Sequence, residues 1–340
     1  MAKNSFYKRF LHSVGLIISV LSVVLFVACN NDDDDEDYVG NWIEQSDFEG
    51  VPRSDGVAFV IGEKAYVGTG YDGSDRLSDI WEYDADRNTW MQKASFPGKA
   101  RNGAVAFATD SKGYIGTGYD GINKLRDFWE FDPVTNTWDS IAEFGGSARY
   151  DAIAFSIDNK GYVGTGYDGN CLKDFWQYNP SEGEWEQVSS LGGGKRRGGA
   201  VFVIDEEAYV CTGIDNGIYE DDFWVYDPSS DLWTKRRSIS NATDYDYDDD
   251  YTMTGINRVA FSMNGKGYLV TGGSVNDIAW EYDPDEDLWE QKTSFEGTGR
   301  IDAVAFTIND RGFVTTGRSS SYYFDDIWEF KPDDEYDEYD

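Results

Sequence analysis

Histidine is almost missing from this 340-residue chain, because the one histidine, His12, lies among the first thirty residues. Its absence from the remainder excludes a Ser-His or Cys-His nucleophilic pair and imidazole ligands for zinc or copper. We therefore expect no metal and no cofactor. Proline is also sparse, with 7 residues, and apolar stripes at helical spacing are absent beyond the N-terminal segment. The abundant Tyr, Trp, Phe, Gly and Asp are typical of an all-β domain of short strands and turns.

Basic residues are few as well. The chain has 29 Lys and Arg against 64 Asp and Glu, and its net charge is −35. Such a protein repels the phosphates of nucleic acid, so we expect no nucleic-acid partner. The charge does not identify the ligand, because salt screens exposed charges beyond about 8 Å and a local basic cluster can differ from the whole.

The N-terminus has the pattern of a secretory signal. Three basic residues precede the apolar run LIISVLSVVLFVA at 16–28, which ends directly before Cys29 and is short for a membrane-spanning helix. The segment FVAC resembles the lipobox of bacterial lipoproteins. The resemblance implies a lipoprotein signal peptide at 1–29 that ends at Cys29, with cleavage before this cysteine and lipid attachment to it. Phe26 replaces the usual Leu. An uncleaved signal anchor is the alternative.

An acidic segment, NNDDDDEDYV at 30–39, follows Cys29. A run of like charges is typical of a solvated tether. It also resembles the export signal of surface lipoproteins in the Bacteroidetes, and the two interpretations are compatible. We expect an outer-membrane lipoprotein at the cell surface that contacts lipid through Cys29.

Two cysteines, Cys171 and Cys211, remain beyond the signal. They could form a disulfide outside the cytoplasm. Cys211, however, lies at a strand position where other repeats have glycine, and Cys171 lies in a loop. The sequence favours free thiols and leaves a disulfide as the alternative.

The hexapeptide GTGYDG recurs at 68–73, 116–121 and 164–169, at a spacing of 48 residues. A fixed period of this length indicates a repeated structural unit rather than a single phosphate-binding loop. Each copy contains an Arg, an apolar run, a Tyr-Val-Gly-Thr-Gly segment, an Asp-aromatic-Trp segment and a second Trp. The first copy predicts four strands, a to d, at 57–61, 64–71, 79–85 and 89–95.

Six copies can be counted, but the last one lacks its fourth strand. The first Trp of each copy is residue 81, 129, 176, 224, 280 or 328. At the other end of the chain, Trp42 precedes Arg53 by eleven residues, as Trp90 precedes Arg101. The N-terminal segment is therefore predicted to supply the outer strand of the last unit and to close a ring, which removes exposed sheet edges.

This pattern, with a small-Gly-Thr-Gly strand end, an aromatic residue and a Trp at a period near fifty, resembles the kelch repeat. The resemblance covers residues 40 to about 332 and implies a six-bladed kelch-type β-propeller at 40–332, followed by an acidic tail at 333–340. The usual glycine pair is replaced by Gly-Thr-Gly in most copies, and Gly272–Gly273 is the plain doublet.

A candidate site follows from the loops of this fold. The b–c and d–a loops of each blade emerge on one face, so recurrent Arg and Tyr residues should ring the mouth of the central channel. These are Arg53, Arg101, Arg149, Arg197 (or Arg196), Arg300 and Arg318, with Tyr71, Tyr119, Tyr167, Asp72, Asp120 and Asp168. Either the arginines form structural ion pairs with an Asp of a b–c loop, or they bind a carboxylate, a sulfate or an acidic peptide while the tyrosines contact a sugar or side chain.

The fifth copy breaks the pattern. Arg258 directly precedes Val259, whereas the other arginines lie four residues before the apolar run, and the preceding loop, 241–257, is long and acidic. This loop could be a disordered segment, a lid over the mouth or a Ca²⁺ ligand, although it lacks the spacing of an EF-hand. The segment 318–326 is a second irregular loop.

We expect a surface-tethered monomeric binding module whose mouth takes a protein or glycan ligand. The kelch family also includes a copper oxidase, which the missing histidines exclude, and a sugar-acid mutarotase, which needs only carboxylate, Arg and aromatic groups. A cofactor-free sugar-modifying enzyme is therefore the alternative. No acid-base pair stands out, so the catalytic residues stay unknown.

Overall fold

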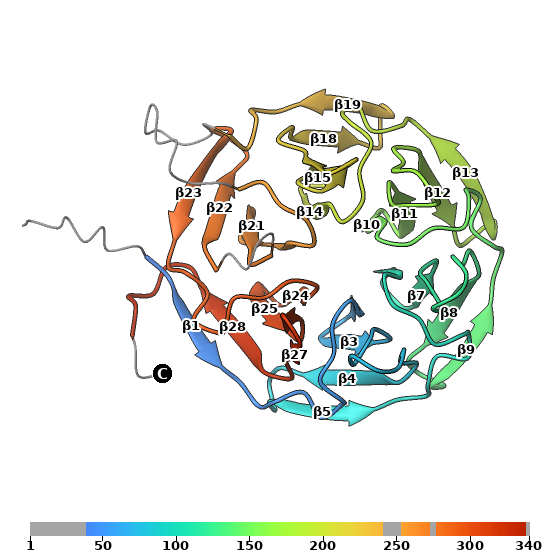
Figure 1. Cartoon of the computed structure of the whole chain (residues 1–340), viewed down its shortest axis with the longest axis horizontal. Helices are drawn as coiled ribbons and strands as arrows, with labels where there is room; N and C mark the ends of the chain where they lie inside the picture. Colours follow the sequence, from blue (N-terminus) through green and yellow to red (C-terminus); the bar gives the residue numbers. More distant parts are fainter. Residues whose placement is uncertain (1–38, 241–252, 273–276, 338–340) are drawn as a thin grey trace, which may run out of the picture. The chain divides into compact units, whose positions relative to one another are not determined.

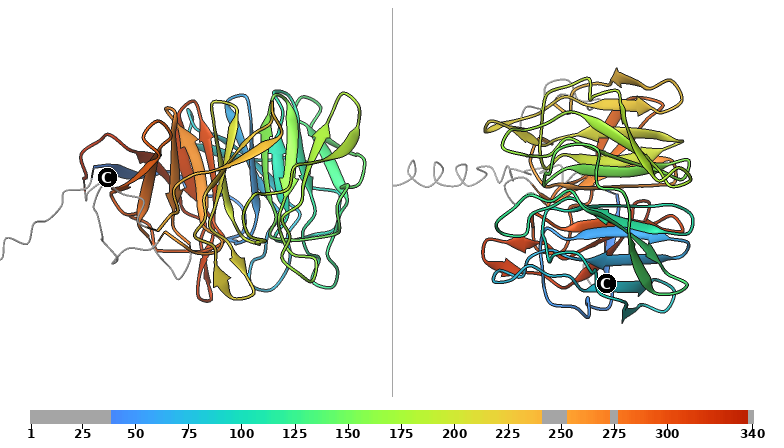
Figure 2. Two further views of the ribbon diagram at one scale, coloured as in Figure 1. Left: turned by 90° about the horizontal axis from the view of Figure 1, so that it is seen from above. Right: turned by 90° about the vertical axis from the view of Figure 1, so that its right-hand side faces the viewer.

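The computed structural model describes residues 39–240, 253–272 and 277–337, which form six four-stranded antiparallel sheets around a ring (Figure 1). This is the six-bladed β-propeller that the sequence predicts. Side views show the loops gathered at the two faces of the ring (Figure 2). No helix that could cross a membrane occurs within the described ranges.

The four strands of each blade run from the channel outward. The inner strands are β2 (Val57–Ile61), β6 (Val105–Ala108), β10 (Ile153–Ile157), β14 (Ala200–Ile204), β20 (Val259–Met263) and β24 (Val304–Ile308). The second strands are β3 (Lys64–Gly68), β7 (Gly113–Gly116), β11 (Lys160–Gly164), β15 (Glu207–Cys211), β21 (Lys266–Val270) and β25 (Arg311–Thr315). The third are β4 (Ile80–Asp84), β8 (Phe128–Asp132), β12 (Phe175–Asn179), β18 (Trp224–Asp227), β22 (Ala279–Asp283) and β28 (Ile327–Lys331). The outer strands are β5 (Thr89–Gln92), β9 (Thr137–Ser140), β13 (Glu184–Val188), β19 (Leu232–Lys235), β23 (Leu288–Lys292) and β1 (Asn41–Glu44).

The second strand of blade one ends earlier than the predicted 64–71. In blade one β3 stops at Gly68, because Thr69 has φ 54° and Gly70 has φ 99°. Both values lie in the left-handed region, which ends strand geometry and which a β-branched Thr rarely adopts. The Gly-Thr-Gly repeat therefore marks the turn into the b–c loop.

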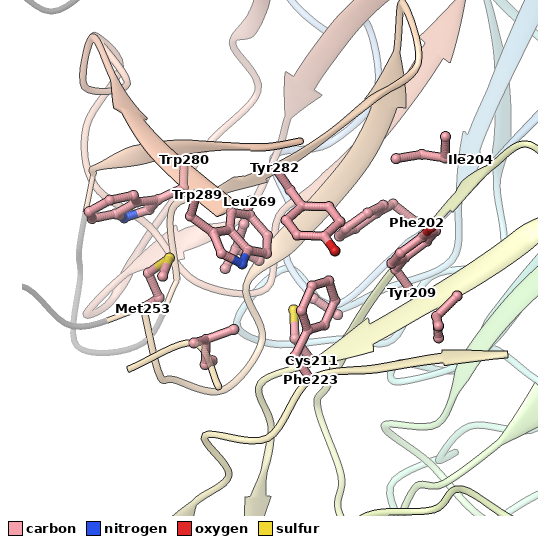
Figure 3. Close-up of a cluster of buried hydrophobic side chains, with 13 residues drawn as sticks. Phe202, Ile204, Tyr209, Cys211, Phe223, Met253, Leu269, Trp280, Tyr282 and Trp289 are labelled. Atoms are coloured by element: carbon pink, nitrogen blue, oxygen red, sulfur yellow. The ribbon is translucent and has the colours of Figure 1, made fainter. Parts of the chain in front are cut away.

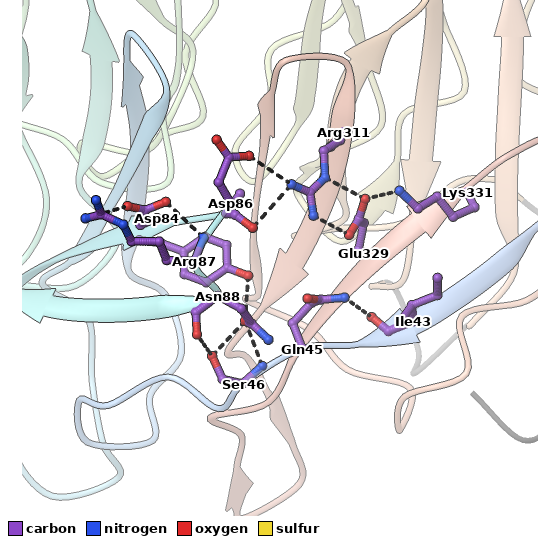
Figure 4. Close-up of polar contacts among 12 residues, drawn as sticks. Ile43, Gln45, Ser46, Asp84, Asp86, Arg87, Asn88, Arg311, Glu329 and Lys331 are labelled. Carbon is purple, nitrogen blue, oxygen red and sulfur yellow. Dashed lines mark hydrogen bonds and ion pairs between the residues drawn. The ribbon is translucent and has the colours of Figure 1, made fainter.

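The N-terminal strand closes the ring. Strand β1 pairs antiparallel with β28, and Trp42 lies opposite Phe330. The next residues reach blade one, where the hydroxyl of Ser46 donates to the backbone oxygen of Asn88 at 2.7 Å (Figure 4). Part of the acidic tail also contacts β1, since the N–H of Asp337 donates to the side-chain oxygen of Asn41 at 3.0 Å. The predicted closure is confirmed.

Aromatic side chains fill the spaces between blades. Between blades four and five, Phe202 lies parallel to Tyr209 at 5.3 Å and close to Tyr282 and Trp289 (Figure 3). A Cβ on Gly267 would lie 2.2 Å from the Phe202 ring, so the next blade needs glycine there. Cys211 is buried in the same cluster.

Both described cysteines, Cys171 and Cys211, are buried free thiols, and the disulfide alternative is wrong. The apolar surroundings of Cys211 raise the pKa of its thiol to about 12, which keeps it in the unreactive thiol form.

Candidate functional site

Five of the recurrent arginines lie inside the protein. In each of these blades the guanidinium binds the carboxylate just before the third strand and a Thr carbonyl at the end of the second. In blade two, Arg101 Nη2 lies 2.7 Å from Asp127 Oδ2, and Nη1 donates to the Thr117 carbonyl at 2.8 Å. The pairs are Arg53–Asp79, Arg101–Asp127, Arg149–Asp174, Arg196–Asp222 and Arg300–Asp326.

These arginines are almost completely shielded from solvent. The structure therefore favours the structural alternative for Arg53, Arg101, Arg149 and Arg300, and it does not place their guanidinium groups in the mouth. It also resolves the choice in blade four, because Arg196 takes the buried position and Arg197 turns toward the mouth. Four of the five, all but Arg196, also lie over a Phe ring, as Arg101 does over Phe96 at 4.7 Å.

A ring of backbone hydrogen bonds narrows the channel at this mouth. Each blade contributes one residue to this ring. In the blades with a buried Arg, it lies two positions after that Arg. In five of the six steps around the ring, the N–H of one blade's residue donates to the carbonyl of the preceding blade's residue at 2.8–3.1 Å. The six residues, called here the mouth ring, are Asp55, Gly103, Asp151, Gly198, Asn257 and Asp302. All six have positive φ, between 51° and 60°.

Three carboxyl groups are thereby brought together on the mouth ring. Burial raises the pKa of Asp55 well above its usual value, and the charges of Asp151 and Asp302 add to the effect. Burial likewise raises the pKa of Asp151 to about 6, against the opposing effect of Arg197. Burial also raises that of Asp302, which accepts hydrogen bonds from Asn257 and Arg318. Raised carboxyl pKa values at a mouth are typical of proton-transfer sites, although structural clusters show them too.

Aromatic rings in contact form a belt above the mouth ring. Tyr323 lies 6.2 Å from Tyr71, and Tyr150 lies 5.7 Å from Tyr119 and 5.5 Å from Tyr167. All five tyrosines are half-buried. We call Tyr71, Tyr119, Tyr150, Tyr167 and Tyr323 the tyrosine belt.

Cations join the tyrosine belt into one surface. The guanidinium of Arg76 lies 5.3 Å from the Tyr71 ring and 4.9 Å from the Tyr119 ring, and Arg197 lies 5.6 Å from Tyr167. Backbone contacts fix two of the rings, since the hydroxyls of Tyr71 and Tyr119 donate to the carbonyls of Gly73 and Gly121, each at 2.8 Å. The belt is thus preorganised before any ligand arrives.

Two of the sequence-predicted arginines, Arg197 and Arg318, reach the mouth, and both are already paired. Arg197 is 35% exposed and lies 2.8 Å from Asp151, and Arg318 is 34% exposed and lies 3.0 Å from Asp302. Their charges are matched by these carboxylates, whereas Arg76 donates from Nε to the amide oxygen of Asn102 at 2.6 Å and is in no ion pair among the described residues. For Arg197 and Arg318, the pairing does not support the expectation of a carboxylate or sulfate ligand.

The sequence placed three belt tyrosines, Arg197 and Arg318 at the mouth, and the structure brings them together. The sequence-based prediction missed Tyr150, Tyr323, Arg76 and the acidic residues of the mouth ring. Part of the signal was present as Arg-x-Asp, which recurs at 53–55, 149–151 and 300–302. The sequence-predicted Asp72 and Asp120 instead cap their own loops, as Asp120 does by accepting from the Asn123 N–H at 2.6 Å. Asp168 does the same through the N–H of Asn170.

The inner strands line an open central pocket of about 190 Å³. It is lined by Gly, Ala, Val and Ile and by one charged residue, Arg258. In the part of the chain that the structure describes, no group of three His, Cys, Asp or Glu side chains is arranged to hold a metal ion. The long acidic loop falls mostly on 241–252, outside the described residues, so its proposed roles stay untested.

Comparison with known proteins supports the repeat assignment. The kelch motif model matches residues 52–97, 157–192 and 195–238. The molecule is a six-bladed β-propeller, and the three matched segments in it are kelch motifs. A solved structure titled "Structure of YjhT" superposes with a TM-score of 0.69 at 16% identity, covering 83% of this chain and 95% of that one. At this identity the likeness shows the fold alone. No curated protein matches the chain.

The acidic residues of the mouth ring predict a specific pH dependence. The folded protein keeps a proton on Asp151 up to about pH 6, whereas an ordinary Asp loses it near 3.8. The higher pKa of Asp151 in the folded state adds to the free energy of unfolding. This contribution is complete below pH 3.8 and is lost as the pH rises through about 6. When ionised, Asp55, Asp151 and Asp302 repel one another, and replacing Asp55 with Asn removes one of these three charges. We expect the D55N protein to melt higher than the unchanged protein above pH 7 and at the same temperature near pH 4. Melting curves across this range measure the difference, and a pH-independent difference would contradict the assignment.

Proposed function

We propose that this protein is a binding module whose mouth binds a glycan. The tyrosine belt is the observation that carries the proposal. Fixed, half-exposed aromatic rings offer flat apolar faces for the C–H face of a sugar, and the carboxyl groups below them can accept hydrogen bonds from hydroxyl groups. The matched charges of Arg197 and Arg318 favour a hydroxyl-rich ligand over a densely anionic one.

Glycan-array binding by the protein purified without residues 1–29 tests this proposal. Tyr150 contacts two other belt tyrosines, so Tyr150→Ala should interrupt the belt. We expect binding to weaken about tenfold, which corresponds to a loss of ~1.4 kcal/mol. Tyr336→Ala, which alters an exposed tyrosine of the acidic tail, is the matched control and should bind normally. If the folded protein binds no glycan, the proposal fails and a protein ligand becomes the candidate.

A second function is favoured by one observation, the raised pKa of Asp151 at the mouth, to about 6. A group of this kind can accept and return a proton near neutral pH, as the mutarotation of a sugar requires. We infer that a cofactor-free sugar mutarotase is the enzyme alternative. NMR of anomer exchange on a sugar acid such as sialic acid, with the protein and its D151N variant, separates the two. If the protein speeds anomer exchange and the D151N variant does not, the result supports the mutarotase. If the protein gives no exchange rate above that of the buffer alone, the binding module is the remaining proposal.

We also propose that the module is anchored at the bacterial cell surface as a lipoprotein through Cys29, with 30–39 as its tether. The lipobox-like FVAC and the six consecutive acidic residues at 32–37 support this. In a producing cell, labelled fatty acid should attach to the unchanged protein and not to Cys29→Ser. Labelling of both proteins would contradict the anchor.

A further inference from the structure

The tyrosine belt extends over four neighbouring blades. Tyr323 comes from blade six, Tyr71 from blade one, Tyr119 from blade two, and Tyr150 and Tyr167 from blade three. Figure 1 shows β27 (Tyr322–Tyr323) of blade six beside β3 of blade one, where the ring closes. The belt therefore follows one side of the mouth and crosses the junction between the two ends of the chain.

The belt ends at Tyr167 because the sequence changes in blade four. Tyr150 and Tyr167 lie opposite each other in a β-bridge, and the same bridge in blade four is formed by Arg197 and Ile214. Isoleucine has no flat face on which a sugar ring can lie. At the other end, Tyr323 contacts the ring of Tyr71. Among the residues that the structure describes, the belt is thus an arc with two ends, Tyr323 and Tyr167.

The arc is longer than one sugar unit. At three steps along it, the centroids of neighbouring tyrosine rings lie 5.5–6.2 Å apart. At the remaining step Arg76 lies between two rings, 5.3 Å from that of Tyr71 and 4.9 Å from that of Tyr119. A pyranose ring is similar in size to one tyrosine ring. A monosaccharide can therefore cover only part of the belt, whereas a chain of several sugar units can contact it from end to end.

The planes of the rings turn along the arc. The rings of Tyr323 and Tyr71 are inclined at 77°, those of Tyr119 and Tyr150 at 39°, and those of Tyr150 and Tyr167 at 65°. A flat array of coplanar rings would suit the surface of an insoluble, crystalline polysaccharide. The turned planes instead match a soluble chain whose successive units change orientation, because each unit can then lie on its own ring.

We propose that the mouth binds a soluble oligosaccharide chain of several sugar units, which lies along the tyrosine belt from Tyr323 to Tyr167. This inference rests on the proposed glycan binding and adds the length, the solubility and the path of the glycan. Because loop carbonyls fix the rings of Tyr71 and Tyr119 before binding, a chain that covers them loses little free energy to ordering of the protein.

An array that carries malto-, cello-, manno- and xylo-oligosaccharides, each as a series of increasing chain length, tests the proposal with the same purified protein. For a series that binds, isothermal titration calorimetry gives the Kd at each length. We expect the affinity to rise about tenfold from the disaccharide to the chain that spans the arc, and to stay constant for longer chains. Crystalline cellulose should not retain the protein.

Variants at the two ends of the arc locate the chain. Tyr323→Ala removes one end, and Tyr167→Ile gives blade three the residue that blade four has at this position. Each should lower the affinity for the longest chain about tenfold and leave that for the disaccharide nearly unchanged, because a short ligand can use the remaining rings. Tyr323→Phe keeps the aromatic face and should bind like the unchanged protein, as should the control Tyr336→Ala. Melting curves show that each variant is folded.

Two results would overturn this inference while glycan binding stands. The first is a Kd that does not depend on chain length. The second is weaker binding in only one of the two end variants, since a site for a single sugar cannot contact both Tyr323 and Tyr167. Retention on crystalline cellulose would count against a soluble chain. If no glycan binds at all, the proposed function fails together with this inference, so the two failures are distinguishable.

Discussion

Replacing Trp42 with alanine should lower the free energy of unfolding by about 3–5 kcal/mol, the range for deleting a large aromatic side chain from a core. The indole is fully buried. It stacks on Phe330 at 4.4 Å and meets Phe295 edge-on at 4.9 Å. Its Nε1 donates to the carbonyl of Thr293 at 3.3 Å, so the loss also breaks a contact between the N-terminus and blade five.

Denaturant unfolding followed by circular dichroism measures this change without relying on tryptophan fluorescence. Trp90→Ala is the matched control, because Trp90 has the same position in blade one but is half-buried, and we expect a smaller loss. Deleting residues 40–50 should be at least as severe as W42A, since it removes β1 and exposes the edge of β28. An unchanged melting temperature after the deletion would contradict the role of β1 in closing the ring.

Replacing Arg101 with methionine should cost about 3–5 kcal/mol, because it leaves the Asp127 carboxylate partly buried without its cation. Burial by itself raises the pKa of Asp127, but the hydrogen bonds and charge of Arg101 outweigh it and lower that pKa below its usual value. The pair therefore stabilises the fold above pH 3.8, and this contribution is lost as the pH falls below that value. In R101M, the free energy of unfolding should therefore lack the decrease below pH 3.8 that comes from this pair.

A double variant separates the contribution of the ion pair itself from the cost of leaving the Asp127 carboxylate without its cation. Arg101→Met combined with Asp127→Leu removes both charges, as blade five does naturally at Gly255 and Ile278, and should be more stable than R101M alone. Arg126→Met is the control for a surface pair, since Arg126 and Glu143 are both more than half exposed. It should change stability by less than about 1 kcal/mol. If R101M were no worse than R126M, the buried pairs would not be structural.

The repeat made most of the fold predictable. Strand positions, blade number and the strand supplied by the N-terminus all depend on the spacing of aromatic residues, glycines and tryptophans along the chain. Trp42 and its eleven-residue distance to Arg53 were enough to indicate ring closure, because the same distance recurs inside the other blades. What could not be predicted was where the second strands end, since the left-handed Thr69 depends on the contacts of its carbonyl with Arg53.

The sequence by itself determined the architecture, because a period of about fifty residues encodes the same local strands in each blade. The tertiary structure alone decided which charges are buried and which meet. Arg196 and Arg197 are neighbours in the chain, yet one lies in the interior and the other faces the mouth. Asp55, Asp151 and Asp302 are far apart in sequence and are brought together by loops from three blades. Burial and the distance between like charges set their protonation, and both exist only once the ring has closed.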